Sequence, residues 1–240
     1  MIALVSLVSL FALSADAAEP IEPGWPLAIV DDGVHGMLLV DQLEYRLPVA
    51  PGALGVDLEG WMGGDVNRLR YRGEGAYGLG ALAGEGELGA AYSRLVGPWV
   101  ELQAGAGVEA QNEAGAGFEA RLEAGVEAVM PYDFDVEAVI RLSHRGRLSA
   151  RFTVVNELLL SQRLVLQLRA EATGAVQESV ELDRARGLES VSAGIRLRYE
   201  VRRAFAPYVG GTWTGGPGGP SGAGDFRRSA AAVGGIRLWY

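Results

Sequence analysis

Charged and polar side chains alternate with apolar ones along most of the sequence. In the run DQLEYR, for example, Gln42, Glu44 and Arg46 take every second position. In the later run FEARLEAGVEA, one set consists of Glu119, Arg121, Glu123 and Glu127, and the other of Phe118, Ala120, Leu122, Ala124 and Val126. Successive side chains of a β-strand point to opposite faces of a sheet. The pattern therefore predicts strands with one charged face and one apolar face.

The alternation divides the chain into about twelve segments, most of which reach the roughly 9 to 11 residues that a tilted strand needs to cross a bilayer. They cover residues 37–47, 54–63, 67–76, 83–94, 98–109, 115–128, 133–143, 147–159, 163–174, 189–201, 205–214 and 229–240. Backbone groups within lipid are satisfied only in helices and closed barrels. The sequence therefore predicts an all-β fold, a transmembrane antiparallel up-and-down β-barrel of about 12 strands.

The connections between these segments alternate between short and long. Short ones lie at residues 63–65, 96–98, 131–133 and 161–162, whereas residues 175–188 and 215–224 form longer ones. This asymmetry is typical of outer-membrane barrels, which have short periplasmic turns and longer external loops.

The two faces indicate which side meets lipid. The polar face carries roughly two dozen ionised groups, and an Arg turned to the middle of a bilayer would cost about 2 to 4 kcal/mol. The charged face is therefore expected to line the lumen. The ending GGIRLWY, with a terminal aromatic at Tyr240, fits the last strand of such a barrel. A secreted soluble sandwich is the competing interpretation, but its strands would not need a membrane-spanning length.

The first residues have the pattern of a secretory signal peptide. An apolar run ends in the small residues Ala15, Asp16 and Ala17, and it is too short to span a bilayer. We predict a signal peptide at residues 1–17, a flexible periplasmic leader at 18–36 and an outer-membrane barrel at 37–240.

Composition restricts the possible functions. The net charge is −9 and the chain has no cysteine. A nucleic-acid partner is not expected, because phosphate binding needs a surplus of basic side chains on one face. The absence of cysteine excludes disulfides, thiolate metal sites and thiol catalysis.

Two sets of charged residues are expected to face each other across the lumen. The acidic set comes from the fourth to seventh predicted strands and would attract cations: Glu85, Glu87, Glu101, Glu109, Glu119, Glu123, Glu127, Asp135 and Glu137. The basic set comes mainly from the eighth to tenth: Arg151, Arg169, Arg196, Arg198 and Arg202. The walls could form a polarised cation pore, or they could neutralise each other and close the interior with ion pairs.

Several longer stretches point to a known family. The runs LLVDQLEYR, GWMGGDVNRLRYRGEGAY, LLLSQRLVLQLRAEA, GIRLRYEVRRAFAPYVG and GIRLWY resemble the copper resistance protein B family. The resemblance covers the chain from about Leu39 onward. It implies an outer-membrane barrel of copper resistance that binds or passes copper or other cations, in contact with outer-membrane lipid and with copper ions or periplasmic copper-handling proteins. The alternative is a non-transporting structural or interaction barrel.

Metal-ligand and catalytic candidates are few. Family members commonly carry a Met- and His-rich segment before the barrel, whereas here that segment offers Asp31, Asp32, His35 and Met37. Imidazole and thioether groups suit copper, so His35 and Met37 are the candidate ligands, although a defined site needs more ligands in fixed geometry. An enzyme is not expected, because the adjacent Ser143 and His144 would point to opposite faces of a strand.

Overall fold

The computed structural model describes residues 33–47, 52–79, 83–112, 117–179, 184, 186–217 and 226–240. The predicted signal peptide and residues 18–32 of the predicted leader lie outside this range. Twelve strands make up the described part: β1 (His35–Leu47), β2 (Ala53–Gly63), β3 (Asn67–Gly78), β4 (Ala83–Gly97), β5 (Val100–Gln111), β6 (Gly117–Met130), β7 (Phe134–Ser143), β8 (Leu148–Leu159), β9 (Leu164–Ala175), β10 (Gly187–Tyr199), β11 (Phe205–Pro217) and β12 (Phe226–Trp239).

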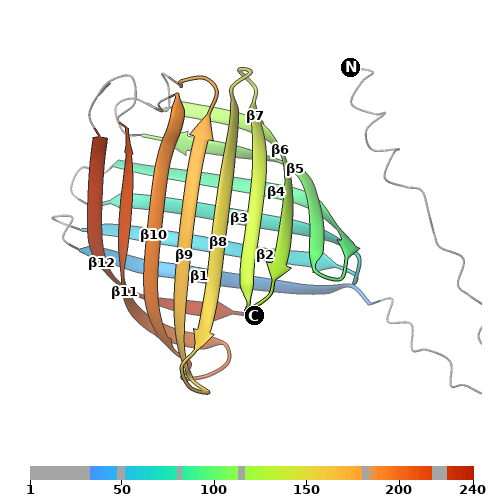
Figure 1. The fold of residues 1–240 in the computed structure, drawn as a ribbon, viewed down its shortest axis with the longest axis vertical. Coiled ribbons are helices and arrows are strands. Elements are labelled where there is room, and N and C mark those ends of the chain that lie inside the picture. Colours follow the sequence, from blue (N-terminus) through green and yellow to red (C-terminus); the bar gives the residue numbers. More distant parts are fainter. Residues whose placement is uncertain are drawn as a thin grey trace, which may run out of the picture. The chain divides into compact units, whose positions relative to one another are not determined.

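The strands form a closed barrel in which each strand pairs antiparallel with its neighbours in sequence (Figure 1). The ring closes where β1 pairs with β12, from Leu39 opposite Trp239 to Leu47 opposite Ala232. A register shift between Val40 and Gln42 interrupts the pairing of β1 with β2. The predicted all-β, 12-stranded, up-and-down barrel is confirmed.

Apolar side chains cover the outside of this barrel. Leu122, Ile140 and Val209 lie on different strands and are 56%, 58% and 64% exposed. The charged residues that alternate with them are buried inside, as Glu119, Arg141 and others show. Each strand thus has the two faces that the sequence predicted. Among the described residues, no helix is long and apolar enough to cross a membrane.

The strand ends differ from the prediction at two places that matter for function. Strand β1 begins at His35, so the last two residues of the predicted leader belong to the barrel. Strand β10 ends at Tyr199, and the backbones of Arg202 and Phe205 then bond to each other in a tight turn. Arg202 is exposed in this turn. It does not lie on the lumen wall where the sequence pattern placed it.

Candidate functional site

Several acidic residues of β5 to β7 form ion pairs with arginines of strand β3. Arg70 on β3 bonds to Glu127 and lies 3.4 Å from Glu101. Arg72, also on β3, bonds to Glu137. The alternation of Arg70 and Arg72 with apolar residues was the sequence signal for their inward direction, but the predicted basic wall did not include them.

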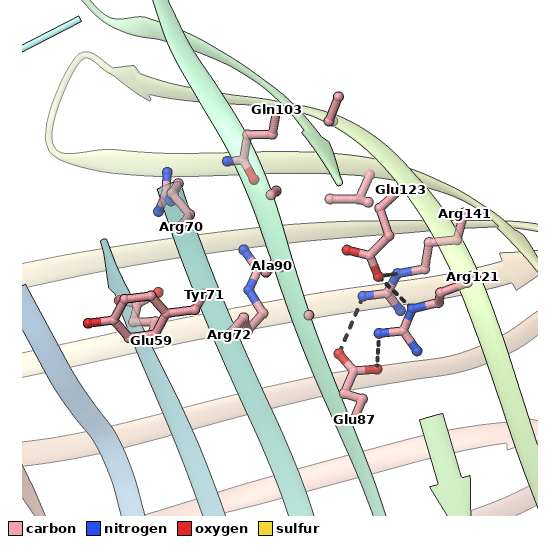
Figure 2. Close-up of a pocket in the computed structure, with 15 residues that line it drawn as sticks. Glu59, Arg70, Tyr71, Arg72, Glu87, Ala90, Gln103, Arg121, Glu123 and Arg141 are labelled. Atoms are coloured by element: carbon pink, nitrogen blue, oxygen red, sulfur yellow. Dashed lines mark hydrogen bonds and ion pairs between the residues drawn. The ribbon is translucent and has the colours of Figure 1, made fainter. Parts of the chain in front are cut away.

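Glu87 lies in a cluster of three arginines, and Figure 2 shows two of them, Arg121 and Arg141, next to its carboxylate. Its carboxylate lies 3.1 Å from Arg121, 3.4 Å from Arg141 and 2.8 Å from Arg151, and its side chain is only 9% exposed. Three guanidinium groups therefore share one carboxylate. Glu123 lies beside the same cluster, 3.5 Å from Arg141. Arg121 and Arg141 come from β6 and β7, so the predicted acidic wall also carries its own cations.

The predicted basic residues mostly find carboxylates that the sequence analysis did not assign. Arg169 donates to Asp57 on β2 at 2.7 Å, and Arg196 lies 3.0 Å from Glu44 on β1. Arg198 makes a bidentate pair with Glu157 on β8, with distances of 2.9 and 2.8 Å. Asp57 and Glu44 alternate with apolar neighbours, and Glu157 lies between Asn156 and Leu158, but no sequence pattern says which cation each carboxylate meets.

Arg151 is the member of the basic set that reaches the acidic set. It donates to both carboxylate oxygens of Glu87, at 2.8 and 3.0 Å, and to Glu74 at 3.2 Å. Its Nε lies 3.4 Å from Glu171 on β9, and Glu171 also lies 3.5 Å from Arg169. A chain of ion pairs thus crosses the lumen from β4 to β2. We call it the central bar, formed by Asp57, Glu74, Glu87, Arg151, Arg169 and Glu171.

The central bar lies between two chambers of the lumen. One chamber, of about 490 Å³, lies towards the short turns and includes Asp133 in its lining. The other, of about 220 Å³, lies towards the long connections and includes Arg184. The residues Asp57, Glu74, Arg151 and Arg169 line both chambers.

The two chambers differ in charge. The carboxylates that line the short-turn chamber are Asp41, Asp57, Glu59, Glu74, Glu127, Asp133, Asp135, Glu137 and Glu157, against the five arginines Arg70, Arg72, Arg151, Arg169 and Arg237. The long-loop chamber has six carboxylates against five arginines. Of the predicted acidic residues, Glu127, Asp135 and Glu137 line the short-turn chamber. The surplus of negative charge is therefore concentrated at one end of the barrel.

The connection between β9 and β10 reaches the lumen wall at the other end. Ser179 donates to Glu119 on β6 at 2.8 Å, and Arg184 bonds to Glu109 on β5. Arg147, in the turn between β7 and β8, lies 3.7 Å from Glu119. Burial, partly offset by the Glu119 carboxylate, lowers the pKa of the Arg147 guanidinium. These contacts cover part of the inner wall at the long-loop end.

The metal-ligand candidates His35 and Met37 line neither chamber. His35 is exposed at the start of β1, and Met37 follows two residues later, opposite Trp61. Asp31 and Asp32 lie outside the described residues. Within the described ranges, no three or more His, Cys, Asp or Glu residues are arranged to hold a metal ion. The structure therefore brings His35 and Met37 close together without completing a site.

Ser143 and His144 are neighbours in sequence but lie in different environments. Ser143 is buried at the end of β7, where its hydroxyl accepts a hydrogen bond from the Arg145 backbone at 3.3 Å. His144 is exposed in the turn, with Nδ1 3.2 Å from the backbone nitrogen of Ala120. This geometry does not pair a nucleophile with a base.

Comparison with known proteins identifies relatives over nearly all of the described barrel. Residues 34–240 match the family described as copper resistance protein B precursor. The chain is 30% identical to copper resistance protein B of Escherichia coli over 218 residues, which covers 89% of this chain and 72% of the relative. It is 32% identical to a copper resistance protein B homolog of Pseudomonas syringae pv. tomato over 217 residues, which covers 88% of this chain and 71% of that protein.

Among solved structures, the barrel is similar to the KdgM porin, with 11% identity, a TM-score of 0.48 and coverage of 82% of this chain and 98% of that one. The sequence matches reach much higher identity over a similar length, and they agree with the resemblance of the strand motifs. The chain belongs to the copper resistance protein B family.

Proposed function

We propose that this chain acts in the outer membrane as the barrel of a copper resistance system. The observation that carries the proposal is the combination of a closed barrel with an apolar outer surface and a buried charged interior. Lipid can cover the outer surface, and the closed ring leaves no strand edge unpaired. Family membership supplies copper resistance as the biological role. Family and fold together point to a non-enzymatic protein, with copper ions and periplasmic copper-handling proteins as the proposed partners.

The ion-pair network favours a lumen that is closed to ions at rest. Arg151 and Arg169 reach across the interior, and each contacts carboxylates from more than one strand. Buried ion pairs are costly to break one partner at a time, because the remaining charge is left without compensation. Of the two interpretations of the charged walls, the neutralised interior is therefore the one we propose.

Passage of cations is the second candidate function, and the short-turn chamber favours it. Its nine carboxylates exceed its five arginines. A cavity lined by a surplus of one charge raises the local concentration of ions of opposite charge. Copper or another cation could therefore gather at this end of the barrel and pass through once the central bar is displaced.

We do not propose stable copper binding inside the described lumen. The chamber walls carry carboxylates and guanidinium groups, whereas copper is best matched by imidazole and thioether ligands. We therefore propose that copper is an ion that the system handles and not one held stably in the lumen. His35 and Met37, near the start of β1, are proposed only as weak, transient contacts for it, because a defined copper site needs more ligands in fixed geometry.

The test is complementation together with fractionation. A strain that lacks its own copy should regain growth at high copper concentration when it expresses the full chain, and the protein should be found in the outer-membrane fraction. In planar bilayers, the purified barrel should show conductance near the baseline. A freely soluble chain, or one that leaves copper tolerance unchanged, would contradict the main proposal, and large constitutive currents would favour the cation-passage candidate.

A further inference from the structure

The central bar connects opposite walls of the barrel through two arginines. Arg151 on β8 donates to Glu87 on β4 and to Glu74 on β3, at 2.8 and 3.2 Å. Its own strand lies four positions from β4 in the order of the sheet. The side chain therefore spans the interior and does not lie along the wall.

Arg169 makes the second crossing. It donates to Asp57 on β2 at 2.7 Å, and its strand β9 is five positions from β2 by way of the closing pair β1 and β12. Glu171 joins the two crossings, because it lies 3.4 Å from Arg151 and 3.5 Å from Arg169. The two arginines and their carboxylates thus form one connected barrier.

The barrier lies where the two chambers meet. Asp57, Glu74, Arg151 and Arg169 line both the 490 Å³ and the 220 Å³ chamber. The side chains of Arg151 and Arg169 are 12% and 22% exposed, so both are largely enclosed by the groups around them. Removal of the two guanidinium groups would take away the cations that link Asp57, Glu74 and Glu171 between the chambers.

We propose that Arg151 and Arg169 are the gate residues of the lumen and that the path they close conducts cations. This inference rests on the proposed function only in placing the barrel in a membrane. Without these two arginines, the short-turn chamber keeps nine carboxylates against three arginines, and the long-loop chamber keeps six against three. Rings and clusters of carboxylates select cations in channels. The opened path is therefore cation-selective.

The experiment replaces the two gate arginines by cysteine, so that a charged group can afterwards be attached to each thiol. The chain contains no cysteine, so Arg151→Cys with Arg169→Cys places thiols only at the gate. In planar bilayers we expect a conductance at least roughly tenfold above that of the wild type, with a reversal potential that shows cation selectivity. A methanethiosulfonate reagent that adds an ammonium group should lower the current again, whereas one that adds a sulfonate should not.

The control is Arg163→Cys with Arg202→Cys, which removes two exposed arginines from the short turns. It should conduct like the wild type. Folding is checked by the heat-dependent migration of the barrel on gels. If the double gate variant does not fold, the single variant Arg151→Cys is measured in its place, because Glu87 then keeps Arg121 and Arg141 as partners.

Three results would contradict the proposal that Arg151 and Arg169 form the gate. They are a folded gate variant with wild-type conductance, an equal rise in the control, and a current that is insensitive to the ammonium reagent. Copper tolerance is measured separately in the complemented strain. If the wild-type chain restores tolerance while the gate variant does not conduct, the proposed function stands and the gate does not.

Discussion

Tyr208 on β11 donates a hydrogen bond to the Glu44 carboxylate on β1 across the strand that lies between them, with an oxygen–oxygen distance of 3.1 Å. The intervening position on β12 is Gly235, which pairs with Glu44 on one side and with Tyr208 on the other. The tyrosine ring therefore lies over a residue without a side chain. Arg196 reaches the same carboxylate at 3.0 Å. These contacts tie the first strand of the barrel to the strands that close it.

Gly235→Ala is expected to destabilise the barrel by about 2 kcal/mol, because a well-packed position that gains a methyl group must force its neighbours apart. A Cβ atom at this position would lie 2.6 Å from the Tyr208 hydroxyl and 2.5 Å from the carbonyl oxygen of Leu43. The free energy of unfolding is measured by urea denaturation in lipid vesicles. The matched control is Gly234→Ala, whose added methyl group would meet nothing within 4 Å. Equal stability of the two variants would contradict the close packing of Tyr208 against Gly235.

Glu87→Gln is expected to lower the free energy of unfolding by about 3 kcal/mol or more, because it removes the carboxylate that three buried guanidinium groups share and leaves them with fewer counter-charges. Arg121, Arg141 and Arg151 would then lie close together around a neutral amide. The control is Glu85→Gln on the same strand, whose side chain is 60% exposed and lies 3.8 Å from Arg184. An exposed pair of this kind contributes about 0 to 1 kcal/mol. Urea denaturation in lipid vesicles measures the free energy of unfolding of both variants. Similar losses of stability would show that Glu87 contributes no more than an exposed carboxylate.

The sequence predicts the strands and their faces well, because alternation is a local property. Glu119 and Arg121 point inward and Leu122 points outward as expected, since neighbouring side chains on a strand must take opposite sides. The end of β10 was less predictable. Arg202 continues the alternation of Arg196 and Arg198, but the chain has already turned after Tyr199.

The partners across the lumen could not be predicted from the sequence. Arg169 meets Asp57, which is 112 residues away in the chain, because the closure of the ring brings β9 opposite β2. Two separate walls of opposite charge are the simplest expectation from a list of strands. The structure instead mixes the charges. Arg121 lies on β6 together with three glutamates, and Arg70 lies on β3, which carries both arginines and a glutamate. Such pairing depends on strand register and on side-chain reach, and neither is encoded locally.

Leu122→Arg is expected to cost about 2 to 4 kcal/mol, because it turns a charge towards the middle of the bilayer. Leu122 lies near the centre of β6 on the outer surface and is 56% exposed. The matched control is Leu160→Arg in the turn after β8, where the residue is equally exposed but lies at the end of the barrel. At that depth an arginine costs only about 0 to 1 kcal/mol. Folding yield into lipid vesicles and urea denaturation measure the difference, and equal effects would contradict a lipid-facing surface on β6.

Replacement of His35 and Met37 by alanine is expected to leave the copper affinity of the folded chain unchanged within about twofold, because one imidazole and one thioether are fewer ligands than a defined copper site needs. Both residues lie on one face of β1, and the described residues provide no cluster of metal-binding groups around them. Calorimetric titration of the purified barrel with copper measures the affinity. The control variant replaces His144 and Met62, an exposed histidine and an exposed methionine elsewhere on the barrel. A loss of copper affinity of more than about tenfold, equivalent to 1.4 kcal/mol, in the His35 and Met37 variant but not in the control would show that the start of β1 binds copper.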